Sequence, residues 1–154
     1  MLTSEVLDYT SRSVLCWLAT VDESGQPNVS PTEIFAAFDS QHIVVANIAS
    51  PTSERNIEVN SRVCISFVDI FVQKGFKVIG TARNIRRSDA DFSKWSTPLE
   101  AMAGAKFPIR SVFVIQAVSV EPIIAPSYRL YTAETTEKSQ VASAMQTYGV
   151  QRSS

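Results

Sequence analysis

Six strand-length runs of apolar or alternating residues, joined mainly by short links, constrain the fold of this chain more than any other feature. Strands joined by short turns pair antiparallel, whereas parallel strands need long crossovers, and the sequence shows no repeated alternation of strand and helix. The pattern therefore predicts a mainly β protein with peripheral helices, an antiparallel barrel or sandwich of six strands. The predicted strands are residues 14–21, 29–38, 42–47, 62–70, 75–85 and 111–121.

The first three predicted strands follow one another closely, so we expect them to form a meander. The run 14–21, V-L-C-W-L-A-T-V, is almost continuously apolar and too short for a core helix. Such a run is typical of a strand that is buried on both faces. Gly80 lies inside the run 75–85, where a glycine indicates a bend or a close approach of another backbone.

Helical patterns flank and interrupt these strands. Ser88 and Asp91 form a capping-box pattern at the start of one helix, and Gly149 is a natural stop for the last one. Pro126 breaks any strand in the segment 123–131, which we expect to be an extended tail. The predicted helices are residues 4–12, 51–59, 88–103 and 134–148.

Length and composition favour a single domain, residues 1–154, in the cytoplasm. Apolar residues make up 45% of the chain and charged residues 19%, as in a globular protein. Fourteen basic and fifteen acidic residues leave a net charge of −1 and form no basic stripe, so we expect no nucleic-acid partner. The acidic N-terminus is unlike a signal peptide, and no apolar run approaches the length of a membrane span, so no membrane partner is expected.

Cysteine and histidine give no sign of a metal or redox centre. Cys16 and Cys64 lie in apolar strand-like runs and lack the C-x-x-C spacing. His42 is the only histidine, which excludes a His-rich metal site. Its position at the start of a predicted strand favours a strand-edge residue over a ligand.

The segment V-A-N-I-A-S-P-T-S-E-R, residues 45–55, has the features of an anion site. Ser50 suits an N-cap and Pro51 the first helical position, so the amides of Thr52 and Ser53 would point outward at the positive end of the helix. Arg55 adds a charge within one turn. On residue types alone, a well-capped surface helix without a ligand is the favoured alternative.

Four segments together resemble the FMN-binding split barrels of the pyridoxamine 5′-phosphate oxidase-like family, over roughly residues 10–122. They are V-L-C-W-L-A-T-V-D-E-S-G-Q-P, S-P-T-E-I-F, the V-A-N strand with its capped helix, and K-G-F-K-V-I-G-T-A. The resemblance implies a split β-barrel that binds FMN and places the flavin phosphate at Thr52, Ser53 and Arg55. It places the isoalloxazine ring along a segment that supplies mainly backbone groups: Ser30, Pro31, Thr32, Glu33 and Ile34.

Further flavin contacts follow from the same resemblance. Ala46 and Asn47 would lie beside the ribityl chain. Lys74, or Gln73 next to it, is a candidate donor near the ring or tail, although a solvated turn is the favoured alternative for both. Members of the family generally dimerise and build each flavin site from both subunits, so we expect a homodimer with two sites at the interface.

Two departures from the family pattern limit the expected activity. The family often has Lys or Arg in the first helical turn to hold the phosphate, where this chain has Thr52 and Ser53. The segment D-F-S-K-W-S-T-P-L-E-A, residues 91–101, lacks the arginine and serine that clamp the substrate phosphate in true pyridoxamine phosphate oxidases. We therefore expect a general FMN-dependent reductase or oxidase of a small molecule rather than a vitamin B6 oxidase.

Three alternatives remain open from the sequence. Relatives with this fold handle haem or the deazaflavin F420, and haem ligation through histidine would be restricted to His42. The third alternative is a barrel dimer that binds no redox cofactor and acts as a ligand-sensing module. The substrate and the electron donor, NADH or NADPH, are not encoded in any recognisable motif.

Overall fold

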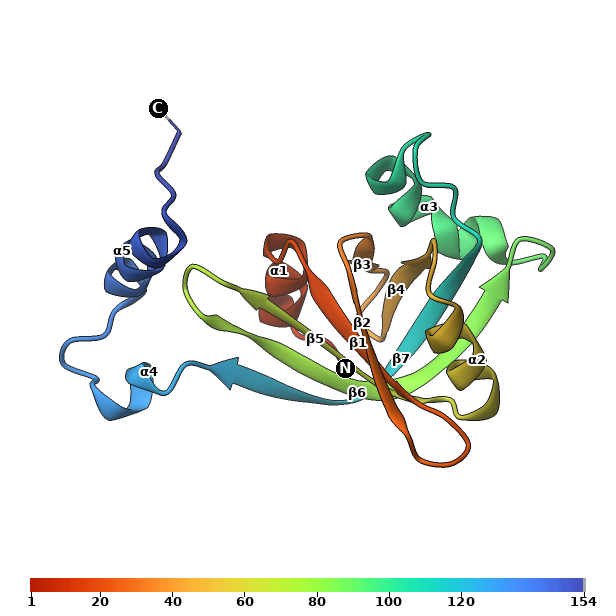
Figure 1. Cartoon of the computed structure of the whole chain (residues 1–154), viewed down its shortest axis with the longest axis horizontal. Coiled ribbons are helices and arrows are strands. Elements are labelled where there is room, and N and C mark those ends of the chain that lie inside the picture. The colour runs from red at the N-terminus through yellow and green to blue at the C-terminus, as the bar shows by residue number, and fades with distance from the viewer. Residues whose placement is uncertain (154) are drawn as a thin grey trace.

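A curled antiparallel sheet with peripheral helices forms the body of the molecule (Figure 1). The computed structural model describes residues 1–153. The helices are α1 (Ser4–Arg12), α2 (Pro51–Val59), α3 (Phe92–Ala103), α4 (Ser127–Leu130) and α5 (Glu137–Tyr148). The strands are β1 (Cys16–Val21), β2 (Pro27–Thr32), β3 (Phe35–Ala37), β4 (His42–Asn47), β5 (Arg62–Asp69), β6 (Lys74–Arg86) and β7 (Ser111–Ile124).

The sheet confirms the predicted mainly β, split-barrel class but has seven strands rather than six within the described residues. Its order is β2-β1-β5-β6-β7-β4-β3, and every pair is antiparallel. The predicted strand 29–38 divides between Thr32 and Phe35, where the Thr32 hydroxyl accepts a hydrogen bond from Ile34 N at 3.3 Å. The run pairs with both of its neighbours, through β2 with β1 and through β3 with β4. Because β2 and β3 lie at opposite ends of the strand order, the three runs do not form one continuous meander.

Two hydrophobic cores lie on the two faces of β4. Ile43 and Val45 belong to the first core with residues of β1 and β5, whereas Val44 and Ala46 belong to the second core beneath α3. Both-face burial was predicted for β1, but β1 alternates, and Trp17 remains 45% exposed on its outer face. A pleated strand buries both faces only where layers cover both, and that condition is met at β4.

Gly80 marks the sharpest irregularity in the sheet, as its position in the sequence predicts. A β-bulge lies between Ile79 and Gly80 in the pairing of β6 with β7. A Cβ atom at Gly80 would lie 2.2 Å from the backbone oxygen of Gln116, so only glycine fits there. The bulge bends β6 and lets one long strand serve both cores.

Two helix boundaries differ from the predictions. The α3 helix begins at Phe92 rather than Ser88, because the Asp89 carboxylate accepts from Arg86 N at 2.7 Å and holds the preceding residues in a turn. The tail after β7 is extended only to Ala125, since the residues after Pro126 form the short helix α4. Gly149 ends α5 with φ of 65°, as predicted.

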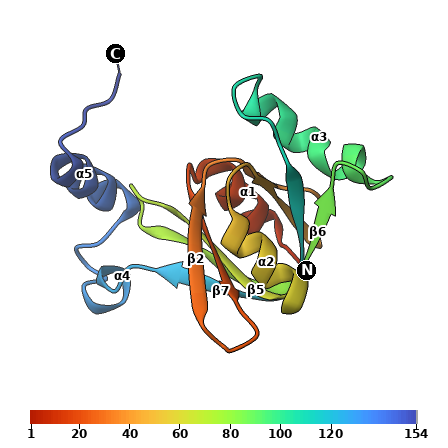
Figure 2. The ribbon, with the colours of Figure 1, turned by 45° about the vertical axis from the view of Figure 1, so that its right-hand side comes forward.

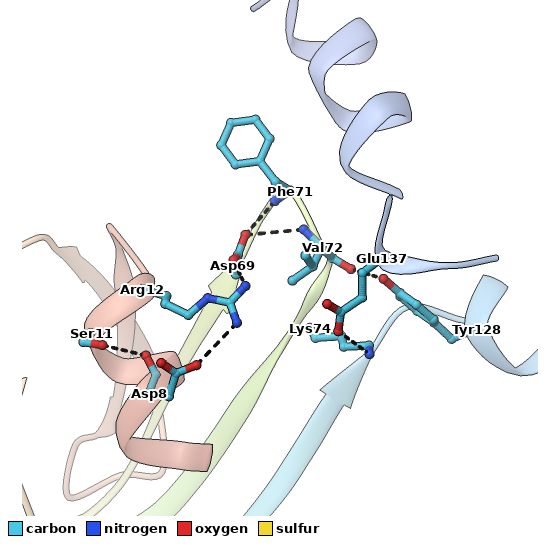
Figure 3. A network of polar contacts seen from close by, with 9 residues as sticks. All are labelled: Asp8, Ser11, Arg12, Asp69, Phe71, Val72, Lys74, Tyr128 and Glu137. Carbon is cyan, nitrogen blue, oxygen red and sulfur yellow. Dashed lines mark hydrogen bonds and ion pairs between the residues drawn. The ribbon is translucent and has the colours of Figure 1, made fainter. Parts of the chain in front are cut away.

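The α4 and α5 helices form a C-terminal arm that lies beside the turn between β5 and β6 (Figures 1 and 2). Tyr128 donates its hydroxyl to Val72 O at 2.8 Å, and Lys74 forms an ion pair with Glu137 at 2.9 Å (Figure 3). Ala144 is the one residue of α5 that is buried. No helix among residues 1–153 is both long and apolar enough to span a membrane.

Candidate functional site

An open cavity of about 670 Å³ lies beside β2, where the sequence places the flavin ring. Four of the five predicted ring residues line it, and these are Pro31, Thr32, Glu33 and Ile34. Its remaining walls are mostly apolar side chains from the residues before β1, the residue after β4 and the end of α3: Val14, Leu15, Ile48, Met102 and Phe107. Flat apolar groups with a few polar atoms suit such a cavity.

The free edge of β2 borders this cavity through Pro31 and Thr32. Because β2 is the terminal strand of the order and pairs only with β1, alternate backbone N–H and C=O groups along its other edge have no strand partner within residues 1–153. Such groups need partners and can pair with the polar edge of a bound ring. Ile34 is an exception, because its N–H donates to the Thr32 hydroxyl and its C=O accepts from Ala46 N.

The first turn of α2 does not itself line this cavity, but Ile48, which does, lies two residues before the N-cap Ser50. Ser50 occupies the N-cap position but its side chain makes no cap hydrogen bond, while its own N–H donates to Asn47 Oδ1 at 3.0 Å. The amides of Thr52 and Ser53 have no acceptor in the described part of the chain. Arg55 donates to the Thr52 hydroxyl at 3.2 Å, so these two exposed side chains lie together on the outer side of the turn.

Ser53 faces the opposite way, into a polar cluster that attaches α2 to the β1–β2 hairpin. Its hydroxyl lies 3.0 Å from the hydroxyl of Ser30 and 3.3 Å from the amide nitrogen of Asn28, and Ser53 is fully buried. The Thr20 hydroxyl accepts from Asn28 at 3.2 Å and from Asn56 at 3.0 Å. The structure thus joins Ser30 to Ser53, two predicted flavin contacts, but through their own hydroxyls.

Ala46 and Asn47 are both buried at the end of β4. The Asn47 amide donates to Glu54 and to Ser111, each at 2.9 Å, and its oxygen accepts from Ser50 N. The Ala46 side chain packs in the second core beneath α3. Their side chains therefore fix the junction between β4 and α2. Their backbone is also engaged, since Ala46 N–H donates to Ile34 O at 3.0 Å and Asn47 O accepts from Arg110 N at 2.9 Å.

Lys74 is not gathered with the other predicted residues. It begins β6, whereas α2 contacts the other end of that strand, where Asn84 donates to the Glu54 carboxylate at 3.4 Å. The hydrogen bond to Glu137 raises the pKa of Lys74, and its ammonium lies 4.4 Å from the centre of the Tyr128 ring (Figure 3). Within one chain, Lys74 thus contacts residues of the C-terminal arm.

The lone histidine and the two cysteines stand apart from the β2 cavity. His42 Nδ1 lies 2.9 Å from Asp39 Oδ1, at the turn before β4. Burial raises the pKa of the Cys16 thiol to about 12, and Cys64 is half-buried and free. No cluster of three metal-ligating side chains occurs among the described residues.

A family model for pyridoxamine 5′-phosphate oxidase matches residues 2–141, nearly the whole chain. The protein belongs to the pyridoxamine 5′-phosphate oxidase family. The match extends well past the resemblance of residues 10–122 and includes α1 and the start of α5. No curated protein matches the sequence.

Solved structures in and around this family share the fold. HupZ from group A Streptococcus superposes with a TM-score of 0.69 and 25% identity, covering 81% of this chain and 96% of its own. An FMN-binding protein from Syntrophomonas wolfei has a TM-score of 0.64 and 15% identity, with 77% and 86% covered. The haem storage protein HutZ from Vibrio cholerae has a TM-score of 0.59 and 20% identity, covering 80% of this chain and 95% of its own. Other proteins with this fold are an FAD-binding protein and an F420 reductase, so one scaffold serves flavins, deazaflavin and haem.

Sequence reasoning missed most of the apolar wall of the cavity. Ile48, Met102 and Phe107 come from three places in the chain that only the fold brings together. Ile48 directly follows Asn47, so its proximity to the predicted site is visible in the sequence. Met102 and Phe107 give no such signal, because their position depends on how α3 packs on the sheet.

Proposed function

We propose that this family member binds FMN in the cavity beside β2 and uses it in the oxidation or reduction of a small molecule. The observation that supports the proposal is the coincidence of the cavity with the segment Pro31–Ile34 on a free strand edge. At about 670 Å³, the cavity falls within the range of roughly 300–1,000 Å³ that is usual for small-molecule sites.

The ring end of the site fits a flavin. Ile34, Ile48 and Phe107 offer apolar surface to the ring faces, and the β2 edge offers backbone donors and acceptors to its pyrimidine side. When bound, the flavin supplies hydride or electron transfer at its N5 atom. The chain's own groups orient the ring and keep water from one of its faces.

The phosphate end fits through Thr52 and Arg55 rather than Ser53. Both exposed side chains lie at the positive end of α2 beside two amides without acceptors. Ser53 is committed to Ser30, so it contributes its backbone amide. A single mobile arginine is a weaker grip than the helix lysine or arginine common in the family, which predicts modest FMN affinity.

A homodimer is part of this proposal. The outer face of the β1–β2 hairpin exposes Val14 (74%), Trp17 (45%) and Val29 (55%) next to the cavity. Exposed apolar side chains that cluster in this way are typical of protein interfaces. A second copy seated there would cover the open side of the cavity and could donate Lys74 to the flavin.

The segment 91–101 supports a substrate other than pyridoxamine 5′-phosphate. In the structure it forms α3, and Trp95 and Leu99 point into the second core. Its Lys94 lies over the Trp95 ring at 4.5 Å. No arginine of this helix is available to clamp a substrate phosphate.

The proposal is tested by fluorescence titration of purified protein with FMN and, separately, with riboflavin. We expect saturable quenching by FMN, and tighter binding of FMN than of riboflavin because only FMN carries the phosphate. Replacing Thr52 and Arg55 by Ala and Met should remove that preference while riboflavin binding persists. Glu58→Gln, on the exposed side of α2, is the matched control. If neither FMN nor riboflavin binds, the result contradicts the proposal and favours the ligand-sensing alternative.

A further inference from the structure

A separate cavity of about 280 Å³ shares no lining residue with the flavin cavity. It is lined by His42 of β4, Val114 and Gln116 of β7, three residues of β6 (Thr81, Ala82 and Arg83), and Ser61, which precedes β5. None of these residues was singled out for flavin binding. The cavity is independent of the proposed function.

The strand register explains why polar residues gather here. His42 pairs with Gln116, which pairs with Thr81, so the three side chains form one row across β4, β7 and β6. The next row, Val44 and Val114, lies in the core under α3. The α3 helix covers the apolar row but not the row of His42, Gln116 and Thr81, whose side chains line the cavity.

His42 is held in a fixed orientation at one wall. Its Nδ1 lies 2.9 and 3.0 Å from the two oxygens of Asp39. Asp39 in turn accepts from the backbone amides of Gln41 at 2.7 Å and His42 at 2.8 Å. With Nδ1–H donated to the carboxylate, Nε2 is the ring atom left for a ligand, and it donates to an anion when the ring is an imidazolium. No partner for Nε2 occurs within residues 1–153.

Arg83 supplies an uncommitted positive charge. It makes no ion pair or hydrogen bond with any described residue, and its guanidinium lies 5.8 Å from the centre of the Trp95 ring. The same ring lies 5.3 Å from the His42 ring, so Trp95 spaces the two groups. A guanidinium with free donors beside an imidazole is suited to a carboxylate or phosphate.

Other charges near the cavity come from two sides. Asp39 stands behind His42, and its negative charge is directed to Nδ1. From α3, Lys94 lies over Trp95 at 4.5 Å, and Asp91 accepts from the Trp95 indole N–H at 2.9 Å. The two carboxylates are thus already hydrogen-bonded, whereas the Arg83 charge is not.

We propose that this cavity binds a small oxyanion, a carboxylate or a phosphate group, held by Arg83, the Nε2 atom of His42 and the side-chain amide of Gln116. Thr81 and Ser61 add hydroxyls at its rim. The volume admits a metabolite-sized anion and excludes a nucleotide cofactor.

The single histidine makes the test direct. In ¹⁵N-labelled protein, the ring nitrogens of His42 give one set of NMR signals, which also report whether Nε2 carries a proton. We expect sodium phosphate or sodium acetate to shift the Nε2 signal saturably, while sodium chloride at matched ionic strength does not. Saturation at a lower concentration of phosphate than of acetate would indicate a phosphate ligand, and the reverse would indicate a carboxylate ligand.

Arg83→Met should weaken the saturating response at least fivefold, because it removes the charge and keeps the chain length. Arg62→Met is the matched control: Arg62 pairs with Thr81 on the neighbouring strand but does not line the cavity. Gln116→Leu gives a second test if Arg83→Met alters the fold. A response that is linear in salt, equal for chloride, or unchanged in both cavity variants would overturn the proposal.

Discussion

At the scale of single residues, Gly80 is a position where the fold does not accommodate a side chain. Because Gly80 has no side chain, the backbone oxygen of Gln116 approaches it closely. A Cβ atom at position 80 would lie only 2.2 Å from that oxygen. We expect Gly80→Ala to lower the free energy of unfolding by about 2–3 kcal/mol, since backbone on both sides must move. Ser119→Ala, on an exposed part of β7, should change it by less than about 0.5 kcal/mol. Urea denaturation measures both, and equal effects would contradict the close approach.

Cys16 gives the structure a predictable sensitivity to alkali. Burial raises its pKa from 9.0 to about 12, so above pH 9.0 the unfolded chain loses a proton that the folded chain keeps. The unfolded state then binds fewer protons, and stability falls as pH rises through this window, by up to about 1.4 kcal/mol per pH unit. Denaturant titrations at a series of pH values from about 8 upward give the free energy of unfolding at each pH. This free energy should decrease less steeply with pH in Cys16→Ala than in the unchanged protein. Parallel curves would show that the thiol is not protected.

At the scale of elements, the polar cluster beneath α2 decides how the helix is held. Ser53→Ala would leave the Ser30 hydroxyl and the Asn28 amide without one partner each. We expect a loss of about 0.5–1.5 kcal/mol, the usual net contribution of a hydrogen bond, because the half-buried Asn28 and Ser30 keep their hydrogen bond to each other. Thr52→Ala on the exposed side should be nearly neutral. Thermal unfolding of the two variants checks this. A neutral Ser53→Ala would mean that the cluster does not anchor the helix.

The C-terminal arm is an element with few buried contacts, so it should detach separately from the sheet. Ala144 is its buried residue, next to Val141, which packs against the first core, and an aspartate at position 144 would place a charge in a buried position. Ala144→Asp should speed tryptic cleavage at Lys138 while the main thermal transition is kept. Ala142→Asp, on the exposed side of α5, should leave the cleavage rate unchanged. Loss of the whole fold in Ala144→Asp would show that the arm is not a separate element.

At the scale of the whole molecule, the sequence predicted the class of fold better than its connections. Periodicity identified the strands and Gly80, because these signals are local. The division of 29–38 into β2 and β3 escaped prediction, since it depends on pairing with distant strands. Likewise the segment Pro31–Ile34 was placed in the site by resemblance, but the opposite wall at Met102 and Phe107 needed the packing of α3.

The most direct test of the account is a crystal structure of the protein with FMN. We expect the isoalloxazine ring against Pro31–Ile34 in the cavity beside β2, with the phosphate at Thr52 and Arg55. A ring bound elsewhere, or a cavity that stays free of FMN at saturating concentration, would contradict the proposed function.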